Sequence, residues 1–262
     1  MIFSHYRTII FISKEKILWA KIKIPSGKIF GLVWALPWSE ENLQTAFADI
    51  KKKFPRNVRV VVGEEFSYVT HFKKAGSENN LASEAQILIP ENLQGAWDTR
   101  EGDSGLVQVM AVQQKFFSTL EKIIFEAGLK VEAVETESIA ISRMIPAEKN
   151  KAVLFARYEE KILLGVVQYG LVLATRIFFK LPDQKEVKEF LDYVSSQKSV
   201  SFESVYVQDK TGELTKIFQQ FKLNVQEALL NPMLGICRKK DIRGDDKKVL
   251  NILMKNDEKA KR

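Results

Sequence analysis

Two stretches of the chain each carry three consecutive β-type apolar runs, and this arrangement limits which folds are possible. The first set falls at residues 8–12, 17–24 and 28–36, and the second set lies within residues 152–179. Short turn sequences such as Pro25-Ser26-Gly27 separate the runs, so each set is predicted to form an antiparallel meander. Segments with helical spacing then alternate with short apolar runs, which is typical of α/β domains. We therefore expect an α/β protein with two lobes of similar layout, although no sequence repeat is visible.

Charge and polarity changes along the chain suggest where the parts begin and end. The first lobe is predicted at residues 1–150, and its polar segment at 73–103 suggests an inserted subdomain over about residues 73–145. A proline and a charged run then precede a second, shortened lobe at residues 151–240. Residues 241–262 form a basic C-terminal tail.

Local signals fix several elements of the first lobe. Ser39 precedes two acidic residues and is predicted to cap a helix that runs to residue 53. Residues 58–62 are a continuous apolar run, as expected for a buried strand. Residues 115–127 have amphipathic helical spacing, and Gly128 is predicted to end that helix in a left-handed conformation.

The net charge of +7 is concentrated near the C-terminus. Residues 238–262 contain ten basic and five acidic residues, a local charge of +5, which leaves +2 for the rest of the chain. Before residue 237 no basic stripe with interleaved aromatic residues is visible. The sequence therefore gives no support to nucleic-acid binding by the folded body.

The few cysteines and histidines exclude some classes of protein. A single cysteine, Cys237, cannot form an internal disulfide or a multi-thiolate zinc site, and it indicates a reducing compartment. His5 and His71 lack the spacing of metal ligands. No metal ion is therefore predicted.

No signal peptide or membrane span is expected from the hydropathy pattern. Residues 162–179 form the longest apolar stretch, but Gln168-Tyr169-Gly170 interrupts it. A polar turn between two apolar runs indicates a hairpin of largely buried strands.

Three segments resemble, in the same order, the PilM family of type IV pilus assembly proteins. The first contains EAGLK at residues 126–130 followed by VETESIA at residues 134–140. The second is the hairpin at residues 161–176, with a glycine at its turn and a Thr-Arg pair in its outgoing strand. The third is NPMLGICR at residues 231–238. The resemblance covers about half of the chain and implies a two-lobed actin-like (ribonuclease H-like) fold with a reduced second lobe.

The resemblance implies a nucleotide site between the lobes, but its key residues are absent. Such a site uses two turns in which an Asp orients Mg²⁺ and a Gly permits close approach of the backbone to phosphate. Phe11 and Ser13 occupy these positions in the first turn, where the family's following Lys falls on Leu18. Ala156 and Tyr158 occupy them in the second turn. No nucleotide, cofactor or ATP hydrolysis is therefore predicted.

Family resemblance, together with these losses, predicts a non-catalytic cytoplasmic scaffold at the inner face of the cytoplasmic membrane. It would bind the cytoplasmic peptide of a PilN-like single-span protein in a pilus, secretion or competence system. The type II secretion L protein has a similar actin-like domain that acts as a binding platform. The alternative is an ATP- or sugar-dependent enzyme of the actin/hexokinase superfold, which requires an Asp at each turn. A basic nucleic-acid-associated protein is a third alternative, and its DNA binding would depend steeply on salt.

The tail contains a candidate partner-binding segment. Its residues are Val249, Leu250, Asn251, Ile252 and Leu253. They resemble the INLLP-type peptide of PilN-like partners, which docks in a groove of the first lobe. If these residues mimic the partner peptide, self-association or autoinhibition is expected. Alternatively, they form a last strand or a frayed amphipathic segment. The polar residues 255–262 are a solvated terminus or, alternatively, contact anionic lipid.

Glu135, Glu137 and Ser138 lie close together in the sequence and could be read as an acid–base group. At the start of a helix, cap and first-turn charges are the more common explanation. We therefore predict a structural role for them.

Overall fold

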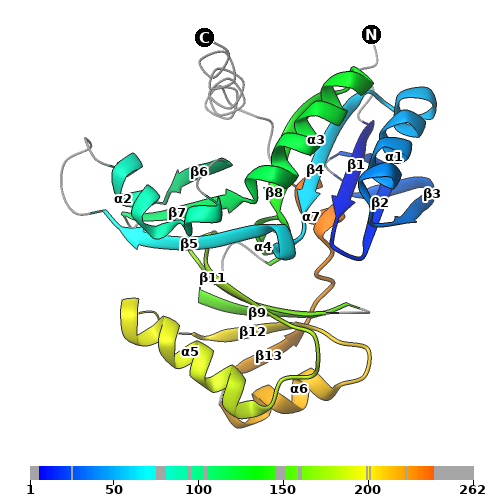
Figure 1. Ribbon diagram of the computed structural model, residues 1–262. Coiled ribbons are helices and arrows are strands. Elements are labelled where there is room, and N and C mark those ends of the chain that lie inside the picture. Colours follow the sequence, from blue (N-terminus) through cyan, green and yellow to red (C-terminus); the bar gives the residue numbers. More distant parts are fainter. Residues whose placement is uncertain are drawn as a thin grey trace.

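The structure is a computed structural model that describes residues 6–24, 26–74, 81–93, 96–102, 105–145, 151–158, 161–198, 200, 202–221 and 223–238. Two lobes lie one above the other, each built on a five-stranded sheet, and a smaller three-stranded sheet extends sideways from the upper lobe (Figure 1). None of the described helices is long and apolar enough to cross a bilayer.

The first lobe is a mixed sheet in the order β3-β2-β1-β4-β8. Its strands are β1 (Tyr6–Ile12), β2 (Lys16–Lys23), β3 (Lys28–Pro37), β4 (Asn57–Val62) and β8 (Lys130–Thr136). β1 pairs antiparallel with β2 and parallel with β4. Alternate residues of β1 point to opposite faces: Ile10 packs under α1 (Glu40–Lys53) and α3 (Gln114–Ala127), whereas Ile9 packs toward α7 (Pro232–Cys237).

The second lobe repeats this topology. Its sheet has the order β11-β10-β9-β12-β13, with β9 (Lys151–Arg157), β10 (Ile162–Gln168), β11 (Leu171–Phe178), β12 (Ser204–Gln208) and β13 (Asn224–Glu227). The first three strands form an antiparallel meander, and β12 and β13 extend the sheet in parallel. Helices α5 (Gln184–Lys198) and α6 (Glu213–Phe218), with the 3₁₀ turn η4 (Gln219–Phe221), cover one face. The predicted two-lobed α/β architecture is confirmed.

The inserted subdomain is smaller than the predicted range of residues 73–145. Its sheet has the order β5-β7-β6; the elements of the insertion are η1 (Glu64–Phe66), β5 (Ser67–Lys73), α2 (Leu81–Leu88), η3 (Glu91–Leu93), β6 (Ala96–Glu101) and β7 (Leu106–Val112). α3 and β8 return to the first lobe, because β8 pairs with β4 and α3 packs against α1. β5 and β6 were not predicted from the sequence, because polar residues interrupt their apolar pattern. Both strands are partly exposed.

The inserted sheet also ties the two lobes together. β11 is the outer strand of the second sheet, and side chains from β5 and β7 reach its backbone carbonyls. His71 Nδ1 lies 2.6 Å from the carbonyl oxygen of Leu173, and Gln108 Nε2 donates to Val172 over 2.9 Å. These contacts cover an edge that would otherwise present unpaired backbone groups.

The local signals read from the sequence are confirmed. Ser39 Oγ accepts from the backbone N–H of Asn42 at the start of α1. Gly128 ends α3 with φ +63°. Tyr169 and Gly170 form the turn of the β10–β11 hairpin with φ values of 51° and 74°, which suits a two-residue turn between antiparallel strands.

Two short helices, α4 (Glu137–Ser142) and α7, pack together between the lobes. Asn231 caps α7 by accepting from the backbone N–H groups of Met233 and Leu234. A Cβ atom at Gly235 would lie 1.9 Å from the carbonyl oxygen of Ala140, so only glycine permits this separation of the helices.

Replacing Gly235 by alanine is expected to destabilise the protein by about 1–3 kcal/mol, because α7 must move away from α4 to accept one methyl group. Thermal or urea unfolding measures the change. Gly165→Ala is the matched control, since a Cβ atom there meets only ordinary contacts at 3.8 Å. Equal stability of the two variants would show that α7 docks more loosely than the structure indicates.

Candidate functional site

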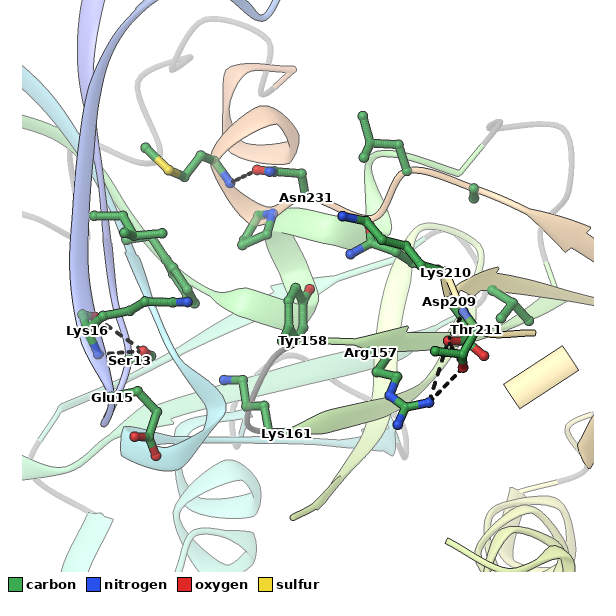
Figure 2. A pocket seen from close by; sticks show the side chains of 18 of the residues that line it. Ser13, Glu15, Lys16, Arg157, Tyr158, Lys161, Asp209, Lys210, Thr211 and Asn231 are labelled. Carbon is green, nitrogen blue, oxygen red and sulfur yellow. Dashed lines mark hydrogen bonds and ion pairs between the residues drawn. The ribbon is translucent and has the colours of Figure 1, made fainter. Parts of the chain in front are cut away.

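A cleft of about 1030 Å³ opens between the two lobes. It is lined by the β1–β2 turn, the β9–β10 turn, the loop after β12 and the segment that leads into α7. Figure 2 shows Ser13 and Lys16 on one wall, Arg157 and Asp209 on the other, and Tyr158 between them. The two strand turns that the family resemblance places around a nucleotide therefore do face one cavity.

Four of the five positions predicted from the resemblance reach this cleft. Phe11, Ser13, Leu18 and Tyr158 line it, whereas Ala156 is fully buried within the second sheet. None of the five carries a carboxylate. Four of the five positions therefore share one cavity, whereas Ala156 does not reach it.

The polar groups of the two turns are bonded within the protein. Ser13 Oγ makes 3.2 Å contacts with the backbone of Lys16 and closes the β1–β2 turn. The backbone N–H of Tyr158 donates to the carbonyl of Lys161 at 2.8 Å. Tyr158 Oη donates to the carbonyl of Leu230 at 3.0 Å, which ties the second lobe to the segment before α7.

The inner end of the cleft is occupied by a buried cation between two carboxylates. Lys161 Nζ lies 2.8 Å from Glu65 Oε1 and 2.6 Å from Glu137 Oε2. All three side chains are at most 5% exposed. Because Glu65 and Glu137 belong to the first lobe and Lys161 to the second, we call these three residues the interlobe ion cluster.

A third carboxylate stands behind this cluster. Glu64 Oε1 accepts from the backbone N–H of Ser138 at 2.9 Å, and its Oε2 accepts from Thr175 Oγ1 at 3.0 Å. The backbone N–H of Glu64 in turn donates to Glu137 Oε2 at 3.4 Å. Three carboxyl groups therefore lie close together around a single ammonium group, so acidic groups outnumber cations in this buried region.

Burial first, and the neighbouring charges second, shift the protonation equilibria of the cluster. Burial raises the pKa of Glu137 to about 7, even though the charge of Lys161 acts in the opposite direction. Burial works against the charged form of Lys161, but Glu137 and Glu65 outweigh it and hold its pKa above the ordinary value. Burial and the charge of Glu137 raise the pKa of Tyr158 well above 10.0, so its hydroxyl remains a donor.

The cluster offers little to a metal ion. No group of three or more His, Cys, Asp or Glu side chains with suitable geometry occurs in the part of the chain that the structure describes. Glu65 Oε2 and Glu137 Oε1 are buried and make no hydrogen bond to any described residue. The other oxygen of each carboxyl group already contacts the ammonium of Lys161.

A second set of polar residues closes the outer wall of the cleft. Arg157 donates to Glu213 at 2.5 Å and to Thr211 at 2.8 Å. Asp209 accepts from the backbone N–H of Leu214 at 2.7 Å and so caps the start of α6. These groups hold the loop after β12 in place.

Glu135, Glu137 and Ser138, the candidate acid–base group, make separate contacts in the structure. Thr136, not Glu135 or Ser138, caps α4, and Glu135 instead forms an ion pair with Arg143. Glu137 is in the first turn, as predicted, but it is fully buried and paired with Lys161. The sequence could not indicate this cluster, because Lys161 lies 24 positions from Glu137 and 96 positions from Glu65.

Several other predicted features have a clear outcome. Cys237 is buried, and burial raises the pKa of its thiol to about 12. His71 is a buried contact between lobes. His5 and the tail, including Val249, Leu250, Asn251, Ile252 and Leu253, lie outside the described residues.

Comparisons with known proteins identify the fold. No protein-family model and no curated protein matches the chain. A PilM–PilN type IV pilus biogenesis complex is similar in structure, with a TM-score of 0.63, 12% identity and coverage of 86% of this chain and 88% of that one. The cytoplasmic domain of EpsL from the Vibrio cholerae type II secretion system has a TM-score of 0.59, 10% identity and coverage of 89% and 94%.

A third structure, a Bacteroides thetaiotaomicron protein with an actin-like ATPase fold and unknown function, has a TM-score of 0.58 and 13% identity. It is matched over 90% of this chain and 97% of that one. The chain therefore has the actin-like fold. At these identities the similarity concerns the fold and not the function.

Proposed function

We propose that this protein is a non-catalytic cytoplasmic scaffold of a type IV pilus or related secretion machine, at the inner face of the cytoplasmic membrane. The observation that supports this most is the content of the cleft. Phe11 and Tyr158 stand where an actin-like nucleotide site requires Asp and Gly, and the interlobe ion cluster supplies an internal cation. Two lobes held together by their own charges suit a rigid platform better than a catalytic site.

The partner in this proposal is the short cytoplasmic peptide of a PilN-like single-span membrane protein. Support comes from the similarity in fold to the PilM–PilN complex and to the cytoplasmic domain of EpsL. The VETESIA segment and the closing NPMLGICR segment, which resemble the PilM family, form α4 and α7 between the lobes. In the tail, Val249–Leu253 would compete for the same groove and favour self-association.

The alternative function is an ATP- or sugar-dependent enzyme of the same superfold. A cleft of about 1030 Å³ is large enough for such a ligand. Catalysis would require an anchor for Mg²⁺, and the turn positions at Phe11 and Ala156 do not provide one.

One titration separates the two functions. The full chain is mixed with the INLLP-type cytoplasmic peptide of a PilN-like protein, with and without Mg-ATP, while released phosphate is measured. We expect the same affinity in both cases and no phosphate above background. Leu250→Ser should strengthen peptide binding if the tail competes, whereas Lys255→Gln should not. Phosphate release, or peptide binding only with Mg-ATP, would contradict the scaffold.

A further inference from the structure

An unusual apolar surface lies on β3, a strand whose residues do not line the cleft. Five large apolar residues within six positions of this strand are 40–74% exposed; they are Ile29, Phe30, Leu32, Val33 and Trp34. β3 is the outer strand of the first sheet, and among the described strands it pairs with β2 alone (Figure 1). We call these five residues the apolar edge. A patch of this kind on a folded protein marks an interaction surface.

The strand bulges outward at the centre of this edge. Trp34 pairs with Trp19 and Phe30 pairs with Lys21, so three residues of β3 lie opposite one residue of β2. Gly31, with φ +85°, permits the bulge, and Leu32 at its tip is the most exposed of the five residues. A bulge of this kind interrupts the row of backbone groups, which disfavours pairing with the edge of a second copy.

Positive charge accompanies the apolar edge. Residues 1–37 contain six basic residues and one acidic residue, whereas residues 38–237 carry a net negative charge. Lys21 Nζ lies 4.7 Å from the ring centroid of Phe30, and Lys53 Nζ lies 5.3 Å from that of Trp34. Lys23 and Lys28 are also exposed beside the strand. Four lysines, at positions 21, 23, 28 and 53, thus lie on or near the strand that displays the apolar side chains.

We propose that the apolar edge binds directly to an anionic lipid bilayer. Leu32 and Val33 would enter the boundary between headgroups and acyl chains, with Trp34 and Phe30 at headgroup depth, where aromatic rings are favoured. The neighbouring lysines would face the anionic headgroups and add electrostatic attraction. An acidic protein partner could use the lysines, but it would not explain a protruding aliphatic tip. This contact does not depend on the scaffold function or on a PilN-like partner.

The test is sedimentation of the full chain with vesicles of phosphatidylcholine alone or mixed with phosphatidylglycerol, at physiological ionic strength. We expect binding only to the mixed vesicles. Leu32→Ser with Val33→Ser should lower the partition coefficient at least about tenfold, and Lys23→Gln with Lys28→Gln should lower it and reduce its salt dependence. Phe125→Ser is the apolar control, since Phe125 is 82% exposed on α3, and Lys185→Gln with Lys188→Gln on α5 is the charge control.

The basic tail could also bind these vesicles, so a second measurement locates the contact. Brominated lipid should quench the fluorescence of Trp34, and Trp34→Phe should remove the quenched part of the signal. Trp34→Phe is conservative, and near-ultraviolet circular dichroism confirms that all variants remain folded. Unquenched Trp34, or unchanged binding by the Leu32/Val33 variant, would overturn the proposal. A change in oligomeric state by light scattering without a change in vesicle binding would also overturn it and assign the edge to a second copy.

Discussion

Replacing Lys161 by methionine is expected to lower the free energy of unfolding by about 3–5 kcal/mol near pH 8. Methionine keeps most of the volume of the side chain, so the loss reports the charge and not a cavity. Without the ammonium, Glu65 and Glu137 remain buried as two carboxylates with no cation between them. Desolvated charges of like sign are among the most costly arrangements inside a protein.

Urea unfolding of the two proteins gives the difference in stability. Lys188→Met is the matched control, because it removes an exposed ion pair with Asp192 and should leave the unfolding midpoint unchanged. The cost of Lys161→Met should be smaller near pH 5, where Glu137 is neutral. If Lys161→Met resembles its control at high pH, the interlobe ion cluster is not formed in solution.

Much of the fold could be predicted from the sequence, because the signals for it are local. The end of α3 was predicted because glycine at position 128 readily adopts a left-handed conformation. The start of α1 was predicted from Ser39 and the next three residues, and the hairpin turn at Tyr169-Gly170 from the apolar runs on either side. The matching layout of the two lobes then follows from the order of these elements. β5 and β6 were missed because polar residues, the buried His71 among them, interrupt their apolar pattern.

The positions of the cleft residues could also be predicted, but its chemistry could not. The family resemblance placed Ser13 and Tyr158 at facing turns, and both line the cavity. The interlobe ion cluster combines residues from η1, α4 and the β9–β10 turn. Its members carry no common motif, since only the packing of the two lobes brings Glu65 near Lys161. The apolar edge was likewise not predicted, because the apolar run of β3 reads as a buried strand when its place in the sheet is unknown.

The effect of pH on stability should depend on Glu137 in a direction opposite to that of an ordinary surface carboxylate. In the unfolded chain its pKa is near 4.5, and in the folded protein it is about 7. Between these values the unfolded state binds fewer protons than the folded state, so the free energy of unfolding falls as pH rises. The loss begins near pH 4.5, is complete somewhat above pH 7, and amounts to roughly 3 kcal/mol.

Glu137→Gln is expected to remove this dependence, because glutamine keeps the shape of the protonated acid and cannot ionise. The variant should match the native protein near pH 4.5 and exceed its stability by up to roughly 3 kcal/mol near pH 8. Lys161 retains Glu65 as a partner, so the substitution leaves no cation unpaired. If the protein becomes more stable when Glu137 can no longer ionise, burying this carboxylate costs more than its ion pair contributes.

The measurement is urea unfolding at a series of pH values from about 4.5 to 8, and the readout is the difference between variant and native protein. Other groups titrate in both proteins alike, so they cancel in this difference. Glu189→Gln removes an exposed carboxylate on α5 and controls for the general change in charge. If Glu137→Gln is less stable than the native protein at pH 8, the attraction of Lys161 exceeds the cost of burial. In that case Glu137 is charged throughout this range, and the lobes are joined by a fully ionised pair.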